Sequence, residues 1–400
     1  MVLEDKFSEI EDICLFNSNK VLEAFWHNNV SEACFNGTTG YGYGDLGRDT
    51  LEKVYAEVFK AEDALVRNQF ISGTHAISTA LFALLRPGDT LLSISGKPYD
   101  TLDSVIGLND NASSLKAFGI KYEQIDLVND DFDDELIKKR IRKGGIKVVA
   151  IQRSMGYAIR ASIDYRKLSR IIKVIKEIDE KVIVFVDNCY CEFVTKVEPI
   201  ELGADICIGS LIKNLGAGIA ENGAYIVGRK DLIHLCSERL NVAGEGKEVG
   251  PTLGVNKGLF LSLYMAPSVV KNALKTAVFA AYELEKMGFK VSPRWNEERV
   301  DIVERIEFND KDLLILFVEC IQKYSAIDHN VVPIPSAMPG YEDNIIMASG
   351  SFVQGSSIEL SCDGPLREPY VAFLQGSLTF EYGKIAITKA IEVLAKKDKN

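Results

Sequence analysis

The sequence predicts an α/β fold, with helices on both faces of a mostly parallel sheet and a smaller α+β domain after it. Short apolar segments alternate along the middle of the chain with segments whose apolar residues recur at helical spacing. The 400 residues are 47% hydrophobic and 26% charged, which excludes a disordered chain and is enough for a large core. Past residue 288, strand-like segments mix with long loops, which predicts the second domain.

The first 60 residues are expected to be irregular and then helical. A glycine-rich run over residues 36–47 leads into an amphipathic helix that begins near Asp49. A second helix is expected to begin at Gly73 and to end at Pro87-Gly88, because this dipeptide stops a helix.

The central strands are short and apolar at nearly every position. They are expected over residues 90–94, 146–151, 182–186, 206–208 and 224–227. A helix is expected over residues 165–178, where apolar side chains at 168, 171, 172, 175 and 178 have helical spacing.

A long helix is expected from Pro267 to Gly288, because proline favours the first turn and glycine follows the last. The smaller domain is expected to contain strands over residues 305–308, 313–318, 345–348 and 357–361. We therefore divide the chain into an N-terminal segment (residues 1–60), a large domain (61–266), and a linking helix with the small domain (267–400).

Charge and composition disfavour several classes of function. Lysine and arginine number 46 and aspartate and glutamate 57, so the formal charge is −11, which opposes nucleic-acid binding. The basic residues over 138–143 are interpreted as a solvated helix face, with a binding patch as the alternative. No apolar run has the length of a membrane helix, and the acidic start does not resemble a secretory signal, so a cytoplasmic location is expected.

The eight cysteines do not predict a disulfide framework or a metal site. Without a secretory signal, reduced cytosolic thiols that pack in the core are favoured. There is no C-x-x-C pair and there are only four histidines, so no metal is expected. Gly42, Gly44 and Gly47 fit G-x-G-x-x-G, but a polar loop precedes them instead of a strand. We interpret them as a flexible or ligand-facing loop.

Three short segments could carry chemistry. Ser72, Gly73 and Thr74 open a helix, where free N–H groups and the helix dipole can bind an anion; an ordinary helix cap is the alternative. Asp187 follows the apolar strand VIVFV, at the edge where α/β sheets bind ligands; a capping carboxylate is the alternative. Lys213 follows another apolar strand in a glycine-rich setting, where desolvation would lower its pKa and make it nucleophilic; a surface loop lysine is the alternative.

Together, these segments match the needs of pyridoxal phosphate. Its phosphate needs a helix N-terminus, its pyridine nitrogen needs a carboxylate, and its aldehyde needs a lysine amine. The chain supplies the three in that order: residues 72–74, Asp187 and Lys213. This order predicts a pyridoxal-phosphate site.

The sequence resembles the fold-type-I pyridoxal-phosphate enzymes of the cystathionine and methionine lyase group. It is most similar to the methionine gamma-lyase-like branch, also called aluminium resistance proteins. The resemblance lies in TTGYGYGDLGRDTLE, FISGTHAIS, SGKPYDTL, VDNCYCEF, GSLIKNLGAG and FVQGSSIELSCDGPLREPY, over residues 38–370.

The resemblance implies a pyridoxal-phosphate-dependent transferase-like fold. In it, the cofactor-binding large domain holds a mostly parallel seven-stranded sheet and a smaller α+β domain lies at the C-terminus. The N-terminal segment then contributes to the small domain and to dimer contacts. The resemblance also implies a homodimer or homotetramer with shared active sites.

The resemblance also implies roles for individual residues. Lys213 resembles the Schiff-base lysine and proton shuttle, and Asp187 the partner of the pyridinium. Tyr99 resembles the aromatic residue stacked on the ring, with a loop tyrosine as the alternative. Tyr43 resembles a tyrosine that reaches the neighbouring subunit's cofactor, and either tyrosine could protonate a leaving group. The residues that resemble phosphate ligands are Ser72, Gly73, Thr74 and Ser210.

Three departures from the family pattern concern the cofactor and the substrate. The usual arginine two residues after Tyr43 is Asp45, and Arg48 is expected to bind the phosphate by another route. In the family, an asparagine on the strand before Asp187 faces a cofactor oxygen. It has no match here, so Gln152 or Arg153 could replace it. The usual arginine for the substrate carboxylate is Glu359 here. The substrate-binding candidates are therefore Arg367, with a structural ion pair as the alternative, and Arg153.

The activity implied is elimination from a sulfur-containing L-amino acid (cystathionine, cysteine or methionine) to a 2-oxo acid, ammonia and a thiol. Alternatives are another pyridoxal chemistry, such as transamination, aldol cleavage or decarboxylation, and a pyridoxal-binding protein without catalysis.

Overall fold

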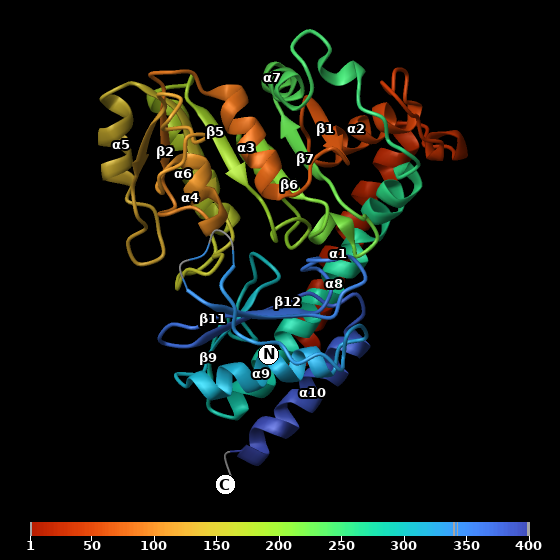
Figure 1. Ribbon diagram of the computed structural model, residues 1–400, viewed down its shortest axis with the longest axis vertical. Helices are drawn as coiled ribbons and strands as arrows, with labels where there is room; N and C mark the ends of the chain where they lie inside the picture. The colour runs from red at the N-terminus through yellow and green to blue at the C-terminus, as the bar shows by residue number, and fades with distance from the viewer. Residues whose placement is uncertain (1, 339–340, 342, 398–400) are drawn as a thin grey trace.

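The computed structural model describes residues 2–338, 341 and 343–397. Its larger body is built on a seven-stranded sheet with the strand order β1-β7-β6-β5-β4-β2-β3 (Figure 1). The strands are β1 (Asp63–Arg67), β2 (Thr90–Ser93), β3 (Lys121–Gln124), β4 (Ile146–Gln152), β5 (Ile183–Asp187), β6 (Ile206–Ser210) and β7 (Ala224–Gly228).

The sheet is mostly parallel, as the sequence predicted. Strands β3, β2, β4, β5 and β6 are parallel, whereas β7 runs antiparallel to both β6 and β1. Successive residues of a strand point to opposite faces, so Ile206 and Ile208 pack in one core and Cys207 in another. The first three residues of β6 are all apolar because helices cover both faces of the sheet.

Ten helices are described. They are α1 (Leu3–His27), α2 (Leu46–Val58), α3 (Gly73–Leu84), α4 (Asp103–Ile106), α5 (Asp134–Arg142), α6 (Tyr165–Ile178), α7 (Lys230–Leu240), α8 (Asn256–Lys286), α9 (Lys311–Lys323) and α10 (Phe380–Lys397). Helices α3 and α7 pack on one face of the large sheet. The other face packs against α5 and α6 beside β4 and β5, and against α1, α2 and α8 beside β6 and β7.

The smaller body is a five-stranded antiparallel sheet with the order β10-β11-β12-β9-β8. Its strands are β8 (Lys290–Ser292), β9 (Glu304–Glu307), β10 (Ile345–Ser349), β11 (Ser361–Pro365) and β12 (Val371–Gln375). Helices α9, α10 and the end of α8 pack on it. Figure 1 shows α8 running along both bodies, with α1 beside it.

Four predicted elements were wrong. The strand expected over residues 357–361 begins only at Ser361, because the buried Glu359 accepts backbone hydrogen bonds from Phe352 and Val353 and holds the residues before β11 in a turn. Residues 313–318 form part of α9 instead of a strand, because Asp310 caps the helix and the buried Leu314, Phe317 and Val318 recur at helical spacing. The long helix begins at Asn256, well before Pro267, because apolar residues of its first turns already pack in the core. The segment expected to be irregular at the N-terminus contains the 25-residue helix α1.

The parallel strands bring three polar side chains to one edge of the sheet. Gln152 ends β4 and is paired in register with Asp187, which ends β5, and Ser210 ends β6. This edge faces the smaller body in Figure 1. Within the described residues, no helix combines the length and the hydropathy that crossing a membrane requires.

Candidate active site

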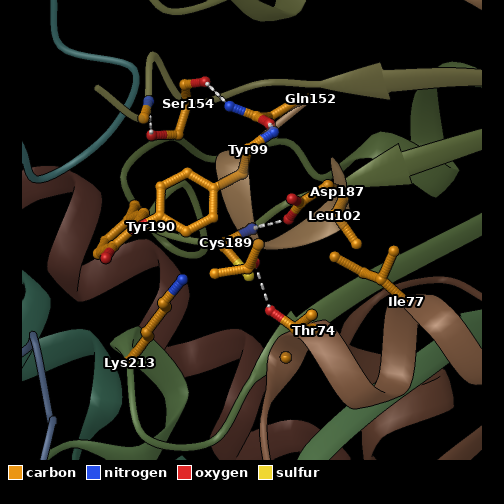
Figure 2. A pocket seen from close by; sticks show the side chains of 13 residues that line it. Thr74, Ile77, Tyr99, Leu102, Gln152, Ser154, Asp187, Cys189, Tyr190 and Lys213 are labelled. Carbon is orange, nitrogen blue, oxygen red and sulfur yellow. Dashed lines mark hydrogen bonds between the residues drawn. The ribbon is translucent and has the colours of Figure 1, made fainter. Parts of the chain in front are cut away.

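A pocket lies at this edge of the large sheet, where β4, β5 and β6 end and α3 begins (Figure 2). Six of the residues singled out in the sequence line it: Gly73, Thr74, Tyr99, Gln152, Asp187 and Lys213. Figure 2 shows Asp187 on one side of the ring of Tyr99 and the amine of Lys213 pointing into the pocket beside Tyr190.

The start of α3 forms the floor of the pocket. Ser72 is the N-cap, and its Oγ accepts a hydrogen bond from the backbone N–H of His75 at 3.2 Å. A Cβ atom at position 73 would lie 3.1 Å from Cβ of Ser210 and 3.4 Å from Sγ of Cys189, so glycine keeps this space open. The exposed N–H groups and the dipole of a 12-residue helix favour an anion here.

Asp187 is held in place by the chain that follows it. Its Oδ1 accepts a hydrogen bond from the backbone N–H of Cys189 at 3.0 Å, and the carboxylate also lines the pocket. The side chain can therefore face a ligand while its own backbone fixes its direction.

Lys213 lies across the pocket, three residues after the end of β6. Its Nζ is 4.1 Å from the ring centroid of Tyr190, a cation–π contact that stabilises the protonated amine. Tyr190 has a φ of 73°, a left-handed conformation that is costly for a tyrosine. Strain of this kind is typical of functional sites, where the surrounding structure holds it.

The prediction that Lys213 has a lowered pKa is wrong. Burial lowers the pKa of the amine, but the acidic groups of Cys189, Tyr190 and Asp187 raise it more, and the net direction is upward. The sequence showed an apolar strand before Lys213 but not the acidic groups that the fold gathers around it.

The buried carboxyl group of Glu192 lies within electrostatic range of Lys213. Glu192 accepts a hydrogen bond from the hydroxyl of Tyr225 at 2.9 Å, and its backbone carbonyl accepts one from Asn214 at 3.0 Å. Burial raises the pKa of Glu192 to about 8, although the hydrogen bond from Tyr225 and the charge of Lys213 lower it. This group therefore carries a proton at neutral pH and supports the turn that holds Lys213.

Aromatic rings form the wall opposite the start of α3. The backbone N–H of Tyr99 donates to Oε1 of Gln152 at 2.7 Å, which fixes the ring over the pocket. The ring centroids of Tyr99 and Tyr157 are 5.6 Å apart, and the hydroxyl of Tyr99 is hydrogen-bonded to that of Tyr341. Burial is the main cause that raises the pKa of Tyr99 well above its usual value, so this hydroxyl keeps its proton.

Gln152, and not Arg153, faces the pocket. Gln152 lines it, and its amide donates to the backbone carbonyl of Ser154 at 3.0 Å. Arg153 is buried elsewhere and donates to Oδ1 of Asn188 at 2.7 Å. The prediction that Arg153 binds substrate is therefore wrong, because adjacent residues of an extended chain point in opposite directions.

The glycine-rich loop does not line the pocket. Tyr43 is 61% exposed and stacks on Tyr41 with ring centroids 5.6 Å apart. Asp45 caps α2 by accepting from the backbone N–H of Arg48, and it also accepts from Thr252 and other side chains.

Arg48 is used within the same loop. It is buried, and it donates to the carbonyls of Gly42 at 2.7 Å and Gly250 at 3.1 Å. These hydrogen bonds occupy the guanidinium of Arg48, which the sequence predicted to bind phosphate. Arg48 therefore acts on the site only by holding the loop that carries Tyr43.

Glu359, which replaces the family's carboxylate-binding arginine, and the remaining candidate Arg367 differ in placement. Glu359 is buried and accepts from the backbone N–H groups of Phe352 and Val353 at 2.8 and 3.0 Å, which makes it part of the framework. Arg367 is half exposed, pairs with Asp343 at 2.9 Å and contacts the carbonyl of Tyr157 at 3.3 Å. It is close to the aromatic wall but does not line the pocket.

Sequence reasoning missed several residues around the pocket. Cys189 was assigned to packing, yet it lines the pocket beside Gly73. Tyr157 and Tyr341 lie outside any strand-end motif, and no local pattern could have indicated them. Tyr190 lies three residues after Asp187 and directly after Cys189. This closeness in the sequence was the one signal that could have indicated it. In the described part of the chain, no group of three or more histidine, cysteine, aspartate or glutamate residues could hold a metal ion.

Comparison with known proteins gives consistent results. The family model described as methionine gamma-lyase matches residues 1–395. The protein YnbB of Bacillus subtilis is 49% identical over 392 residues, which cover 97% of this chain and 93% of YnbB.

Two solved structures are similar over nearly their whole length. A candidate cystathionine beta-lyase involved in aluminum resistance, from Listeria monocytogenes, has a TM-score of 0.95 and 48% identity, and the match covers 98% of this chain and 96% of that one. A carbon-sulfur lyase involved in aluminum resistance, from Clostridium novyi, has a TM-score of 0.94 and 47% identity, with 98% and 93% covered.

Proposed function

The chain belongs to the methionine gamma-lyase family, and from this premise we propose that it is a pyridoxal-phosphate-dependent carbon–sulfur lyase. Its substrate is a sulfur-containing L-amino acid, which it cleaves to a 2-oxo acid, ammonia and a thiol. The observation that carries the proposal is the pocket in which the start of α3, Asp187 and Lys213 converge.

The residues of the pocket fit pyridoxal phosphate. Gly73 leaves a space that even a methyl group would narrow. The space lies at a helix start with free N–H donors, which suits the phosphate. Ser72, Thr74 and Ser210 add hydroxyl groups around it. Asp187, Tyr99 and Lys213 all line the pocket and would meet the ring nitrogen, the ring face and the aldehyde, respectively.

When bound, the cofactor supplies an aldehyde for an amine and a ring that accepts the electrons left after proton removal. Lys213 provides that amine and is the base that takes the proton from Cα of the substrate. The ring of Tyr190, 4.1 Å from Nζ, stabilises the lysine once it has taken the proton. The hydroxyl of Tyr99, held by Tyr341, donates a proton to the departing sulfur.

Arg367 is proposed to bind the substrate carboxylate. In the ligand-free chain its guanidinium pairs with Asp343 and is half exposed, so a carboxylate can replace that partner at low cost. Its contact with the backbone of Tyr157 places it at the aromatic wall.

The working form is proposed to be a homodimer or homotetramer with shared active sites. The exposed Tyr41–Tyr43 pair, on a loop fixed by Arg48, supports a role at a neighbouring subunit's cofactor. The proposed location is the cytoplasm, since the eight cysteines are free thiols and reducing conditions maintain that state.

The test is turnover of a panel of sulfur amino acids by the cofactor-loaded enzyme, with 2-oxo acid, ammonia and thiol measured together. The proposal predicts all three in equal amounts from at least one substrate. Formation of a 2-oxo acid without a thiol would indicate transamination instead. Tight cofactor binding without turnover of any substrate would favour a non-catalytic pyridoxal-binding protein.

A further inference from the structure

A second cavity lies between the two bodies, where α1 and α8 meet two loops. Its volume is about 650 Å³, which is in the range of small-molecule sites. One wall is the linker between β8 and β9 of the small sheet, which carries Arg299. Another wall is the loop after β5 of the large sheet, with Val194 and Thr195. The residues that line this cavity are all different from those that line the active-site pocket.

The guanidinium of Arg299 is incompletely bonded. The residue is 5% exposed, and its Nη2 donates a hydrogen bond to the buried carboxylate of Glu304. Its Nε and Nη1 are buried and have no hydrogen-bond partner among the residues that the structure describes. Buried donors without a partner cost free energy, and an acceptor carried by a ligand would recover it.

The two buried charged residues that line this cavity, Arg299 and Lys6, are both basic. The carboxylates that line it belong to the exposed residues Glu9, Asp12 and Glu298. The amine of Lys6 is already paired with Glu9 at 2.8 Å, whereas Arg299 keeps donors without a partner. The interior of the cavity therefore favours an anionic group, which Arg299 would bind.

The rest of the interior is largely apolar. Ile10 of α1, Val194 of the loop after β5 and Leu274 of α8 are buried and line the cavity. A ligand that fits has a carboxylate for Arg299 and a small apolar body for these side chains. A ligand without a charge would leave the donors of Arg299 as they are.

The linker that carries Arg299 leads to the active site at Tyr190. Three residues after Arg299, the backbone N–H of Ile302 donates to the carbonyl of Tyr190 at 3.2 Å. The next residue, Val303, belongs to the apolar cluster on which Tyr190 packs. Because the ring of Tyr190 lies 4.1 Å from Nζ of Lys213, a shift of the linker would be felt at the lysine.

We propose that this cavity binds a small carboxylate with an apolar body and that its occupancy changes turnover through Tyr190. The second part rests on the proposed function, since it needs an active lyase. The first part needs neither cofactor chemistry nor turnover, so the two parts are measured separately.

Binding is tested by calorimetry on the cofactor-loaded enzyme, with 3-methylbutanoate and its uncharged amide as probes. The wild type is expected to bind the carboxylate about tenfold more tightly than the amide. Arg299→Gln should remove this preference. Ile13→Trp fills the cavity and leaves Arg299 and Glu304 in place, and it should weaken the binding of both probes. Arg367→Ala is the control for binding at the active site and should keep the preference.

Equal affinity of the wild type for the two probes would overturn the site. Loss of the preference in Arg367→Ala would also overturn it, because the carboxylate would then be bound at the active site. Saturating 3-methylbutanoate should change kcat for thiol release by about twofold or more in the wild type but not in Arg299→Gln. An unchanged kcat, or a rise in KM alone, would overturn the coupling. If no sulfur amino acid releases a thiol, the lyase proposal fails, whereas calorimetry still decides the site.

Discussion

The two sides of the active site are built differently. On the large-sheet side, the functional groups lie at or just after the ends of buried strands or at a helix start: Asp187 ends β5, Lys213 lies three residues after β6, and Gly73 begins α3. On the small-sheet side, Tyr157 comes from the loop after β4 and Tyr341 from the chain before β10, so the two rings are far apart in the sequence. The first side is held by the rigid sheet, and the second depends on how the two bodies pack together.

This difference suggests that the two sides of the site bind different partners. The strand-end groups suit a constant partner, the cofactor, because their geometry is fixed by the sheet register. The aromatic wall suits the variable partner, the substrate, because side chains there can change without disturbing a strand. Changes on the large-sheet side should therefore affect the cofactor and all substrates alike, and changes on the small-sheet side should affect particular substrates.

The largest effect is expected from Lys213→Ala. Removal of the amine eliminates both the covalent attachment and the base, so turnover should fall by about 1,000-fold or more on every substrate. Steady-state kinetics on the substrates found in the panel would measure it. The matched control is Lys230→Ala, an exposed lysine at the start of α7, which should retain activity. Substantial activity in Lys213→Ala would break the assignment.

A second large effect is expected from Gly73→Val. The added side chain would press against Ser210 and Cys189, 3.1 and 3.4 Å from the new Cβ, and fill the space for the phosphate. Cofactor affinity should fall by about 10-fold to 100-fold, as measured by fluorescence titration. Gly258→Ala, at an open position in α8, is the control and should leave affinity unchanged. Unchanged affinity in Gly73→Val would place the phosphate elsewhere.

Arg367→Ala tests the small-sheet side. Loss of the proposed carboxylate ligand should raise KM by about 10-fold, with little change in kcat or in cofactor affinity. Arg294→Ala, which also removes an exposed arginine paired with a carboxylate, serves as the control. A fall in cofactor affinity in Arg367→Ala would contradict the division between the two sides.

The smallest effect concerns the buried Glu192. Because burial raises its folded-state pKa to about 8 from about 4.5, the folded protein holds a proton that the unfolded chain releases between these values. Its contribution to stability is complete below pH 4.5 and is lost as the pH rises through 8. Glu192→Gln cannot titrate, so relative to the wild type it should gain about 1–3 kcal/mol of unfolding free energy between pH 5 and pH 8.

Urea unfolding of the wild type and Glu192→Gln at the two pH values measures this change. Glu283→Gln, at a half-buried surface carboxylate of α8, is the control and should follow the wild type. The same pH dependence in the wild type and in Glu192→Gln would show that Glu192 is ionised in the folded protein.

The positions of the functional groups on the large-sheet side could be predicted because each follows from the residues next to it in the sequence. A carboxylate or lysine just after an apolar strand has a fixed place at the sheet edge, and Gln152, Asp187 and Ser210 lie there. The side chains of the small-sheet wall had no such signal. The raised pKa of Lys213 depends on Cys189 and Asp187, which the fold brings close to it. The residues next to Lys213 in the sequence could not indicate these neighbours.

Errors in secondary structure had similar causes. The apolar run in α9 lacks a visible period, so strand and helix could not be separated by residue type alone. Pro267 was interpreted as a helix start, although α8 continues through it because its earlier residues are held in the core.

The central claim is that Lys213 is the lysine that binds the cofactor, and chemical trapping tests it most directly. Cofactor-loaded protein is reduced with borohydride, digested and mapped by mass spectrometry. The account predicts that the added mass is found on the peptide containing Lys213, and that Lys213→Ala shows none. Cofactor mass on another lysine, or on no peptide of the wild type, would contradict it.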